Sequence, residues 1–204
     1  MRIETLAVAL VFGLLPVSLG AAAEPEKGFV PLFDGKTLKG WTAMPGGTWE
    51  VKDGAIVGTS QKSERRHGLL LSDKKYKNFT VRLKFKPVKG NSGFYFRSEK
   101  VKHAVGVNGF QAEIDPNRDT GGLYETGGRA WVVKAGKIEG FQGGQWNEMT
   151  VTADGGDVVV TVNGHKTAEL KNDPGRKEGH FALQLHGGQD MHVEFKDIAI
   201  LEKP

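Results

Sequence analysis

The sequence predicts an all-β protein built as a two-sheet antiparallel jelly-roll sandwich. Three observations predict this fold class. The 204 residues include 29 Gly and 8 Pro, which divide the chain into short runs. Apolar and polar residues alternate within those runs, as they do in strands with one buried face. Finally, no amphipathic stretch is long enough for a secure helix. We expect one domain of roughly a dozen strands, because no linker interrupts the chain after residue 28.

The N-terminal 23 residues are typical of a signal peptide. Arg2 precedes an apolar run from Leu6 to Leu19, and Ala21, Ala22 and Ala23 supply small residues for cleavage. The run of about 14 residues is short for a bilayer span. We therefore expect an exported, periplasmic or extracellular protein without stable membrane insertion, with an uncleaved anchor as the alternative. A short tail at 24–28 would then lead into a sandwich at 29–204.

Composition removes several classes of function. The chain has no Cys, which excludes disulfides, thiol catalysis and thiolate metal sites. Its formal charge of +4 is spread over scattered Lys residues rather than a basic patch, so no nucleic-acid partner is expected. Composition carries no signal for an oligomeric state. Signatures of serine hydrolases, zinc proteases and dinucleotide-binding enzymes are also missing from the sequence.

Two runs show strand periodicity most clearly. In Asn78–Lys86, four apolar residues alternate with Thr, Arg and Lys, which predicts one buried and one wet face. Met191–Leu201 is also strand-like, but its period slips at Lys196-Asp197, which predicts a bulge. A further strand is expected to start at Trp146-Asn147-Glu148, with Trp146 as a core anchor.

Two pairs of strands are joined by residues that favour tight hairpins. Asn163-Gly164 separates the runs Asp157–Val162 and His165–Leu170, and Asp53-Gly54 similarly follows Trp49–Lys52. Both central residues of such turns take positive φ, a conformation that Asn, Asp and Gly tolerate best.

Three strands depart from the simple pattern of apolar inside and charged outside. In Asn91–Arg97, the residues Asn91, Tyr95 and Arg97 share one face, where an aromatic ring beside a forked cation suits a sugar. An exposed Tyr-Arg stack on an ordinary outer face is the alternative.

The second strand carries Gln111, Glu113 and Asp115 on one face. Carboxylates two residues apart on a strand have Cα atoms roughly 6.5–7 Å apart, within reach of acid–base work on glycosides. Their like charges would raise the pKa of one of them. A solvated edge strand, or a pair that holds a structural Ca²⁺, is the alternative.

The third strand ends in Gln184-Leu185-His186-Gly187-Gly188, where Gln184 and His186 share the face opposite the core. A His before two Gly residues is accessible, so His186 is a candidate general base, although a lone His is more often structural. The Gly-flanked segment between residues 120 and 131 adds four candidate ligand contacts. These are Tyr124, Glu125, Arg129 and Trp131.

These segments together resemble the 3-keto-disaccharide hydrolase domain family. The resemblance covers about residues 28–203 and rests on several short motifs in the expected order. They are Phe33–Trp41, Asn91–Arg97, Gly109–Asp115, Gly122-Leu123-Tyr124, Trp146-Asn147 and Leu183–Gly188. The resemblance implies a concanavalin A-like lectin/glucanase sandwich and cleavage of glycosides oxidised to a ketone at C3.

The chemistry of such a substrate suggests roles for these residues. A C3 ketone acidifies the C2 hydrogen, so a base can form an enolate that expels the aglycone from C1. His186 or Glu113 would be the base, and Arg97, with or without a divalent metal such as Ca²⁺, would stabilise the enolate. Glu113, Asp115 or Tyr124 would protonate the leaving oxygen.

Two other functions compete with this interpretation. A non-catalytic carbohydrate-binding module would depend on aromatic side chains more than on the acids. A conventional sandwich glucanase fits less well, because Pro116, Asn117 and Arg118 follow Asp115 where a further carboxylate is expected.

Overall fold

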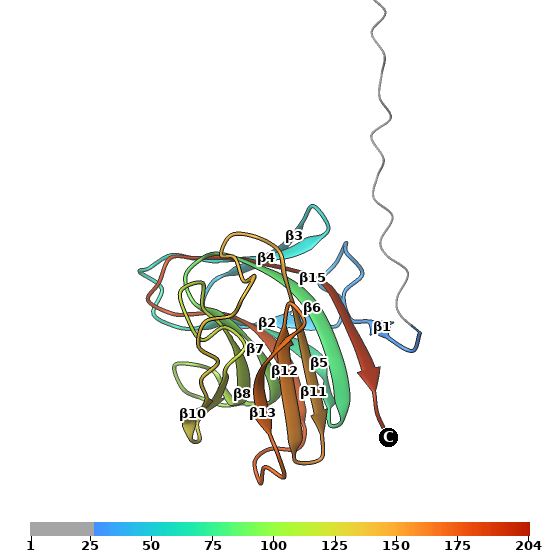
Figure 1. The fold of residues 1–204 in the computed structure, drawn as a ribbon. Helices are drawn as coiled ribbons and strands as arrows, with labels where there is room; N and C mark the ends of the chain where they lie inside the picture. The colour runs from blue at the N-terminus through green and yellow to red at the C-terminus, as the bar shows by residue number, and fades with distance from the viewer. Residues whose placement is uncertain (1–26) are drawn as a thin grey trace, which may run out of the picture.

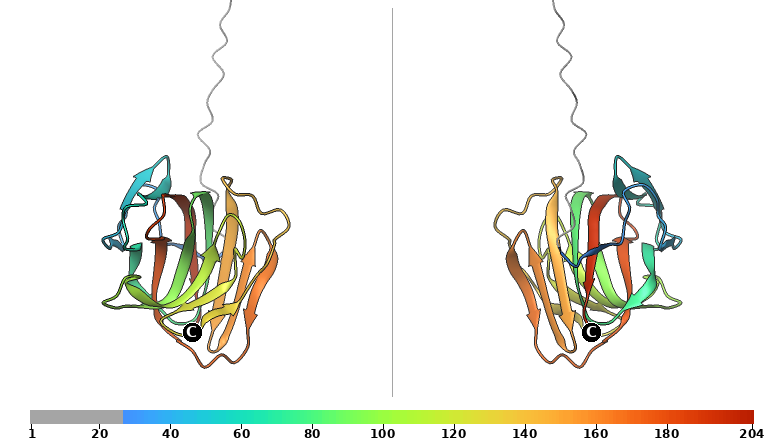
Figure 2. Two further views of the ribbon diagram at one scale, coloured as in Figure 1. Left: turned by 90° about the vertical axis from the view of Figure 1, so that its left-hand side faces the viewer. Right: turned by 90° about the vertical axis from the view of Figure 1, so that its right-hand side faces the viewer.

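The computed structural model describes residues 27–204, which form two antiparallel β-sheets packed face to face (Figures 1 and 2). The strands are β1 (Val30–Pro31), β2 (Trp41–Ala43), β3 (Thr48–Lys52), β4 (Ala55–Ser60), β5 (Gly68–Tyr76), β6 (Phe79–Lys89), β7 (Ser92–Lys100), β8 (Val107–Ile114), β9 (Leu123–Thr126), β10 (Ala130–Val133), β11 (Asn147–Asp154), β12 (Asp157–Val162), β13 (His165–Leu170), β14 (Gly179–Leu185) and β15 (Met191–Glu202). The described residues contain no helix. The predicted signal peptide, 1–23, and residues 24–26 of the predicted tail lie outside the described residues.

The strand order confirms the predicted two-sheet antiparallel sandwich, with 15 strands in residues 27–204 rather than a dozen. Sheet A has eight strands in the order β13-β12-β11-β6-β15-β4-β3, with β1 also paired to β15. Sheet B has seven strands in the order β10-β9-β8-β7-β14-β5-β2. Neighbours in the sheets are often far apart in sequence, so the fold brings residues from distant segments to one face.

The core lies between the sheets and follows directly from strand periodicity. In β6, Phe79, Val81, Leu83 and Phe85 are all at most 1% exposed, while the residues between them are half-buried on the outer face. The inner faces of β7, β8 and β14 contribute Phe94, Phe96, Phe110, Ala112, Ile114, Phe181, Leu183 and Leu185. Each large apolar side chain buried in this way contributes about 1.5–3 kcal/mol, which lets a chain without disulfides fold.

The predicted turns and bulge are confirmed. Asp53 and Gly54 have φ of 50° and 75°, and Asn163 and Gly164 have φ of 50° and 80°, as tight hairpin turns require. In β15, the pairing with β6 shifts register between Lys196 and Ala199, where Asp197 has a φ of 52°.

Trp146 is not the core anchor that the sequence predicts. The strand β11 begins one residue later, at the buried Asn147, whose amide donates to the carbonyl oxygens of Gln142 and Gln145 at 2.9 Å. Trp146 is half-buried, and the Lys196 ammonium lies 4.2 Å from its ring centroid. The amide of Asn147 therefore anchors this entry into the sheet.

The outer face of sheet B is divided into an apolar and a polar part. Leu69, Leu71, Tyr95, Val107 and Ala182 form a small second cluster there, against which Met44 and Val105 pack. The loop between β7 and β8 thus covers one part of the face. Polar side chains of β8, β14 and the segment before β5 occupy the adjoining part. Residues 27–204 include no helix of the length and apolarity needed to cross a bilayer.

Candidate functional site

Four neighbouring strands, β8, β7, β14 and β5, build a polar site on the outer face of sheet B. In the β7–β8 ladder, Gly93 pairs with Glu113 and Tyr95 pairs with Gln111. Since successive side chains alternate between faces, the buried Phe94 and Ala112 that separate these residues point into the core. Glu113 and Gln111 are consequently directed away from the core.

Glu113 is enclosed by amide donors. The Nδ2 of Asn91 donates to its Oε1 in a short contact, and the Nε2 of Gln111 donates to its Oε2 at 2.9 Å. Its side chain is buried, with 5% exposure of the residue. Burial raises the pKa of Glu113 to about 7; the hydrogen bond from Asn91 opposes this shift, and the negative charges of Asp115 and Asp119 add to it. Glu113 can therefore hold and release a proton near neutral pH.

A chain of side-chain amides leads from Glu113 across the sheet. The Nε2 of Gln111 also lies 3.4 Å from Oε1 of Gln184 on β14, and Nε2 of Gln184 lies 3.1 Å from Nδ1 of His67. Because β7 lies between β8 and β14, the backbones of these two strands are about 10 Å apart. The absence of a side chain at Gly93 leaves the space that Gln111 uses to span this distance.

Two imidazole rings stand at the far end of this chain. His67 directly precedes β5 and His186 directly follows β14, and their ring centroids are 4.3 Å apart at 51°. Both side chains are half-buried. Burial, together with the nearby His186 and His103, lowers the pKa of His67 to about 4. His67 is therefore neutral at physiological pH, which suits a hydrogen-bond or proton-transfer role.

An aromatic pair lies at the open edge of sheet B. Tyr124 on β9 pairs with Gln111 on β8, and Trp131 on β10 pairs with Tyr124. The two rings meet edge to face, with centroids 5.5 Å apart at 88°, and Trp131 remains 36% exposed. The predicted Gly-flanked loop is thus a hairpin whose aromatic side chains share the face of Gln111.

Tyr95 supports the site from within. It is 1% exposed, and its hydroxyl lies 2.9 Å from Oγ1 of Thr126 and 3.4 Å from Nε2 of Gln184. Burial raises its pKa, so the phenol stays protonated. Of the contacts predicted for a sugar, Tyr95 is therefore part of the scaffold and is not an open platform.

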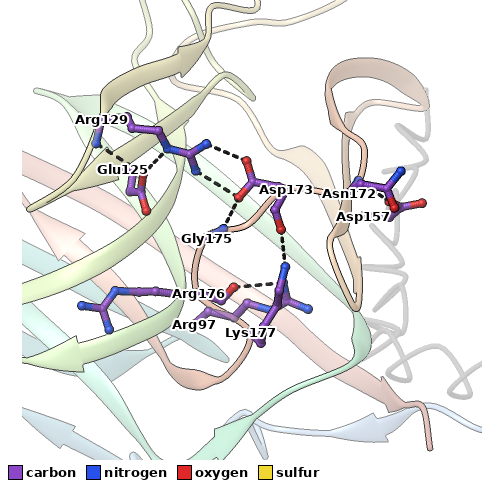
Figure 3. A network of polar contacts seen from close by, with 9 residues as sticks. All are labelled: Arg97, Glu125, Arg129, Asp157, Asn172, Asp173, Gly175, Arg176 and Lys177. Atoms are coloured by element: carbon purple, nitrogen blue, oxygen red, sulfur yellow. Dashed lines mark hydrogen bonds and ion pairs between the residues drawn. The ribbon is translucent and has the colours of Figure 1, made fainter.

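The expectation that Arg97 shares the face of Tyr95 is wrong. The β7–β8 register shifts between Phe96 and Glu99, and Arg97 has a φ of 49°, which turns its side chain out of the alternation. Its guanidinium donates to the carbonyl oxygens of Lys77, Gly155 and Arg176 at 2.9–3.2 Å, and the residue is 1% exposed. Figure 3 shows the contact with Arg176. Arg97 joins three chain segments and does not reach Glu113.

Glu125 and Arg129 also lie outside the polar site. Strand alternation turns Glu125 away from the face of Tyr124, and the Arg129 guanidinium connects Glu125 with Asp173 (Figure 3). The two Arg129–Asp173 contacts measure 2.6 and 3.0 Å. Glu125 and Asp173 are buried, so this cluster ties the β9–β10 hairpin to the segment before β14.

Asp115 lies beyond the end of β8 and acts on Glu113 through its charge. Its Oδ1 accepts a hydrogen bond from the backbone amide of Asn117 at 2.8 Å. The hydroxyl of Thr120 accepts from the backbone amide of Asp115 and donates to its carbonyl oxygen. Within residues 27–204, no three His, Asp or Glu side chains gather as metal ligands. A divalent metal therefore stays a prediction from the sequence, and the reaction proposed for this site uses side chains alone.

Sequence reasoning missed His67. The segment Arg65-Arg66-His67-Gly68 stands before the apolar run Leu69-Leu70-Leu71. A His-Gly step next to a buried strand is the same signal that singles out His186, but here it precedes the strand. The pairing of Leu185 with Gly68 in the β14–β5 ladder brings the two His residues together.

The chain matches, over residues 28–201, the family described as the 3-keto-alpha-glucoside-1,2-lyase-like domain. A relative from Bacteroides thetaiotaomicron, named 3-keto-disaccharide hydrolase, is 32% identical over 175 residues, which cover 70% of this chain and 58% of the relative. The chain thus spans little more than half the length of that relative.

Two solved structures are similar in fold. A candidate glycosyl hydrolase from Parabacteroides distasonis has a TM-score of 0.66 and 23% identity, covering 87% of this chain and 94% of that one. The carbohydrate-binding module CBM66 from Bacillus subtilis has a TM-score of 0.62 and 21% identity, covering 80% and 96%. Both support the predicted lectin/glucanase-type sandwich.

Proposed function

Because the chain belongs to the 3-keto-alpha-glucoside-1,2-lyase-like domain family, we propose that it cleaves glycosides that carry a ketone at C3. The relative from Bacteroides thetaiotaomicron is named for hydrolysis of 3-keto-disaccharides, which supports a carbohydrate substrate of this class. The site on the outer face of sheet B is the proposed active site.

One observation carries this proposal. Glu113, a carboxyl group with a pKa of about 7, shares one face with the imidazoles of His67 and His186. The Gln111–Gln184 amides connect Glu113 to His67, and the His186 ring lies against His67. Such a site offers a proton donor and a neutral nitrogen base at the same pH. Elimination next to a ketone requires both, because one proton leaves C2 while another reaches the departing oxygen.

The proposed reaction proceeds in two balanced stages. An imidazole nitrogen takes the C2 proton, and the C–H electron pair forms the enolate of the C3 ketone. The enolate then expels the aglycone oxygen from C1, which takes the proton of Glu113, and a C1=C2 enone remains. Water adds its oxygen to C1 and gives a proton to the Glu113 carboxylate, while the imidazolium returns a proton to C2. The sum is hydrolysis.

A carbohydrate-binding role without turnover is the second candidate function. The observation that favours it is the exposed Trp131 packed against Tyr124 at the edge of the site, since a sugar ring can stack on such a surface. In that case the protein would bind an unoxidised glycan, and the acid would matter less than the aromatic residues.

A time course with a 3-keto-glucoside that bears a chromogenic aglycone tests the proposal. The purified protein is compared with its Glu113→Gln variant, on the keto substrate and on the unoxidised glucoside, with and without EDTA. We expect the wild-type protein to release the chromophore from the keto substrate but not from the unoxidised glucoside, and the variant to release none. Loss of this activity in EDTA would add a metal to the mechanism. Failure to release the chromophore, together with saturable glycan binding, would replace the proposal with the binding role.

A further inference from the structure

The side-chain amides between Glu113 and His67 have a defined direction. Gln111 Nε2 donates to Glu113 and to Oε1 of Gln184. Since Oε1 of Gln184 is an acceptor, its NH₂ group is the end that faces His67 Nδ1, at 3.1 Å, and the Tyr95 hydroxyl, at 3.4 Å. Gln184 is 2% exposed, so these contacts lie away from bulk solvent. The side-chain amides of Gln111 and Gln184 are therefore each oriented by their neighbours.

This direction determines the tautomer of His67. An NH₂ group can only donate, so Nδ1 of His67 is the acceptor and the ring proton of the neutral imidazole is on Nε2. Among residues 27–204, Nε2 of His67 has no hydrogen-bond partner. It is left as an N–H donor on a half-buried ring.

His186 has the opposite tautomer. Its Nδ1 lies 2.8 Å from the carbonyl oxygen of Gly187. A carbonyl can only accept, so Nδ1 carries a proton, and in the neutral ring Nε2 presents a lone pair. Within the described part of the chain, this Nε2 also has no partner. Two adjacent imidazoles thus offer one N–H donor and one base.

We propose that Gln184 is a positioning residue that holds His67 as a neutral Nε2–H donor to the enolate oxygen, while Nε2 of His186 removes the C2 proton. This inference rests on the proposed function, which does not distinguish His67 from His186. It gives each of the two histidines its own role. It also replaces Arg97 as the stabiliser of the enolate. A neutral imidazole can donate to an oxyanion without first being charged, and its N–H is already in place when the negative charge develops.

The groups that surround His67 are compatible with this role. His103, on the loop between β7 and β8, accepts the amides of Val105 and Gly106 at its Nδ1 and contacts Oδ1 of Asn108 at 2.7 Å through Nε2. The Nδ1 atom of His103 is therefore a hydrogen-bond acceptor, and its ring proton is on Nε2. The neighbouring Arg66 is paired with Glu64, and the carboxyl of Glu113 is separated from His67 by two amides. Among residues 27–204, no carboxylate contacts Nδ1 of His67 to draw a second proton onto the ring.

Histidine ¹H–¹⁵N correlation spectra of the protein and of the Gln184→Glu and Gln184→Met variants test the tautomer directly. We expect His67 to carry its proton on Nε2 and to remain neutral from pH 5.5 to 8. A carboxylate at position 184 accepts a proton from Nδ1, so Gln184→Glu should show a protonated Nδ1. A proton on Nδ1 of His67 in the unmodified protein, or its titration in this range, would overturn the inference without bearing on whether keto-glycosides are cleaved.

Kinetics on the 3-keto-glucoside test the consequence. We expect kcat of Gln184→Glu and Gln184→Met to fall about 100-fold, comparable to the loss of one oxyanion donor, with KM changed less than threefold. The His103→Gln variant is the matched control and should keep kcat within about threefold. Both Gln184 variants leave the core face of β14 intact, and circular dichroism verifies folding. Unchanged kcat in two folded Gln184 variants would refute the positioning role.

Discussion

Gly93 lies directly opposite Glu113 in the β7–β8 ladder, and the space above its Cα is occupied by the side chain of Gln111. A Cβ atom at position 93 would lie 2.5 Å from Nε2 and 2.6 Å from Cγ of Gln111. Both distances are far below van der Waals contact, so the amide could not stay where it contacts Glu113 and Gln184. The absence of a side chain at Gly93 is thus a condition for the hydrogen bonds of Gln111.

Gly93→Ala should therefore reduce activity while leaving the fold intact. We expect displacement of the Gln111 amide to lower kcat on the 3-keto-glucoside at least about tenfold, equivalent to ~1.4 kcal/mol of transition-state stabilisation. The core is on the other face of β7, so the melting temperature should change little. Gly143→Ala is the matched control, because its Cβ would meet only Pro116, at 3.3 Å, in a loop. Full activity of folded Gly93→Ala would show that Gln111 need not occupy this space.

Glu113 should make stability fall as pH rises. Its pKa is about 7 in the folded protein against 4.5 for the free side chain, because burial disfavours the carboxylate. Below pH 4.5 the carboxyl group is protonated in both the folded and the unfolded protein, so it does not lower the free energy of unfolding. Between pH 4.5 and about 7 only the unfolded chain ionises, so the folded state loses up to about 3 kcal/mol.

The measurement is chemical denaturation of the protein and of Glu113→Gln at pH 4.5 and 8. The wild-type protein should lose more stability between the two pH values than the variant, which has no carboxyl group to ionise at this position. Glu50→Gln is the control, since it removes an exposed carboxyl group on β3 of sheet A, away from Glu113. Identical pH dependence of wild type and Glu113→Gln would mean that Glu113 ionises normally.

Arg97 should prove structural. Its removal takes away the buried guanidinium that donates to the carbonyl oxygens of Lys77, Gly155 and Arg176. We expect Arg97→Met to lose about 3 kcal/mol of stability and ~10 °C in melting temperature. The exposed Arg118→Met is the control. At a temperature where both variants are folded, kcat should match the wild type, and a selective loss of kcat with unchanged stability would restore a catalytic role.

Arg97 and Glu113 show where strand alternation predicts the direction of a side chain and where it does not. Alternation over Gly109–Asp115 places Gln111 and Glu113 on the face opposite Phe110 and Ala112, and the structure has them there. The same alternation fails for Arg97, because a bulge with positive φ inverts the pattern. Residue types favour positive φ at Asp53 or Asn163, but an Arg in that conformation carries no such signal.

Long-range pairing explains what else could not be predicted. His67 enters the site only because β5 pairs with β14, which is more than 100 residues later in the chain. Likewise, Arg129 meets Asp173 through the packing of the β9–β10 hairpin on the segment before β14, and nothing in the spacing of Tyr124, Glu125 and Arg129 predicts that partner. Local patterns define faces of strands, whereas the site depends on which strands become neighbours.

Trp131 distinguishes the two candidate functions. Its ring is 36% exposed and meets Tyr124 edge to face, beside the strand that carries Gln111 and Glu113. If the protein is an enzyme, Trp131→Ala should raise KM for the 3-keto-glucoside about tenfold, or ~1.4 kcal/mol, with kcat nearly unchanged, because a stacking surface binds substrate and transition state alike. Trp146→Ala, which alters the outer face of sheet A, is the matched control and should leave both constants unchanged. A fall in kcat with constant KM would place Trp131 in the reaction itself, and weaker glycan binding by a protein with no turnover would favour the binding module.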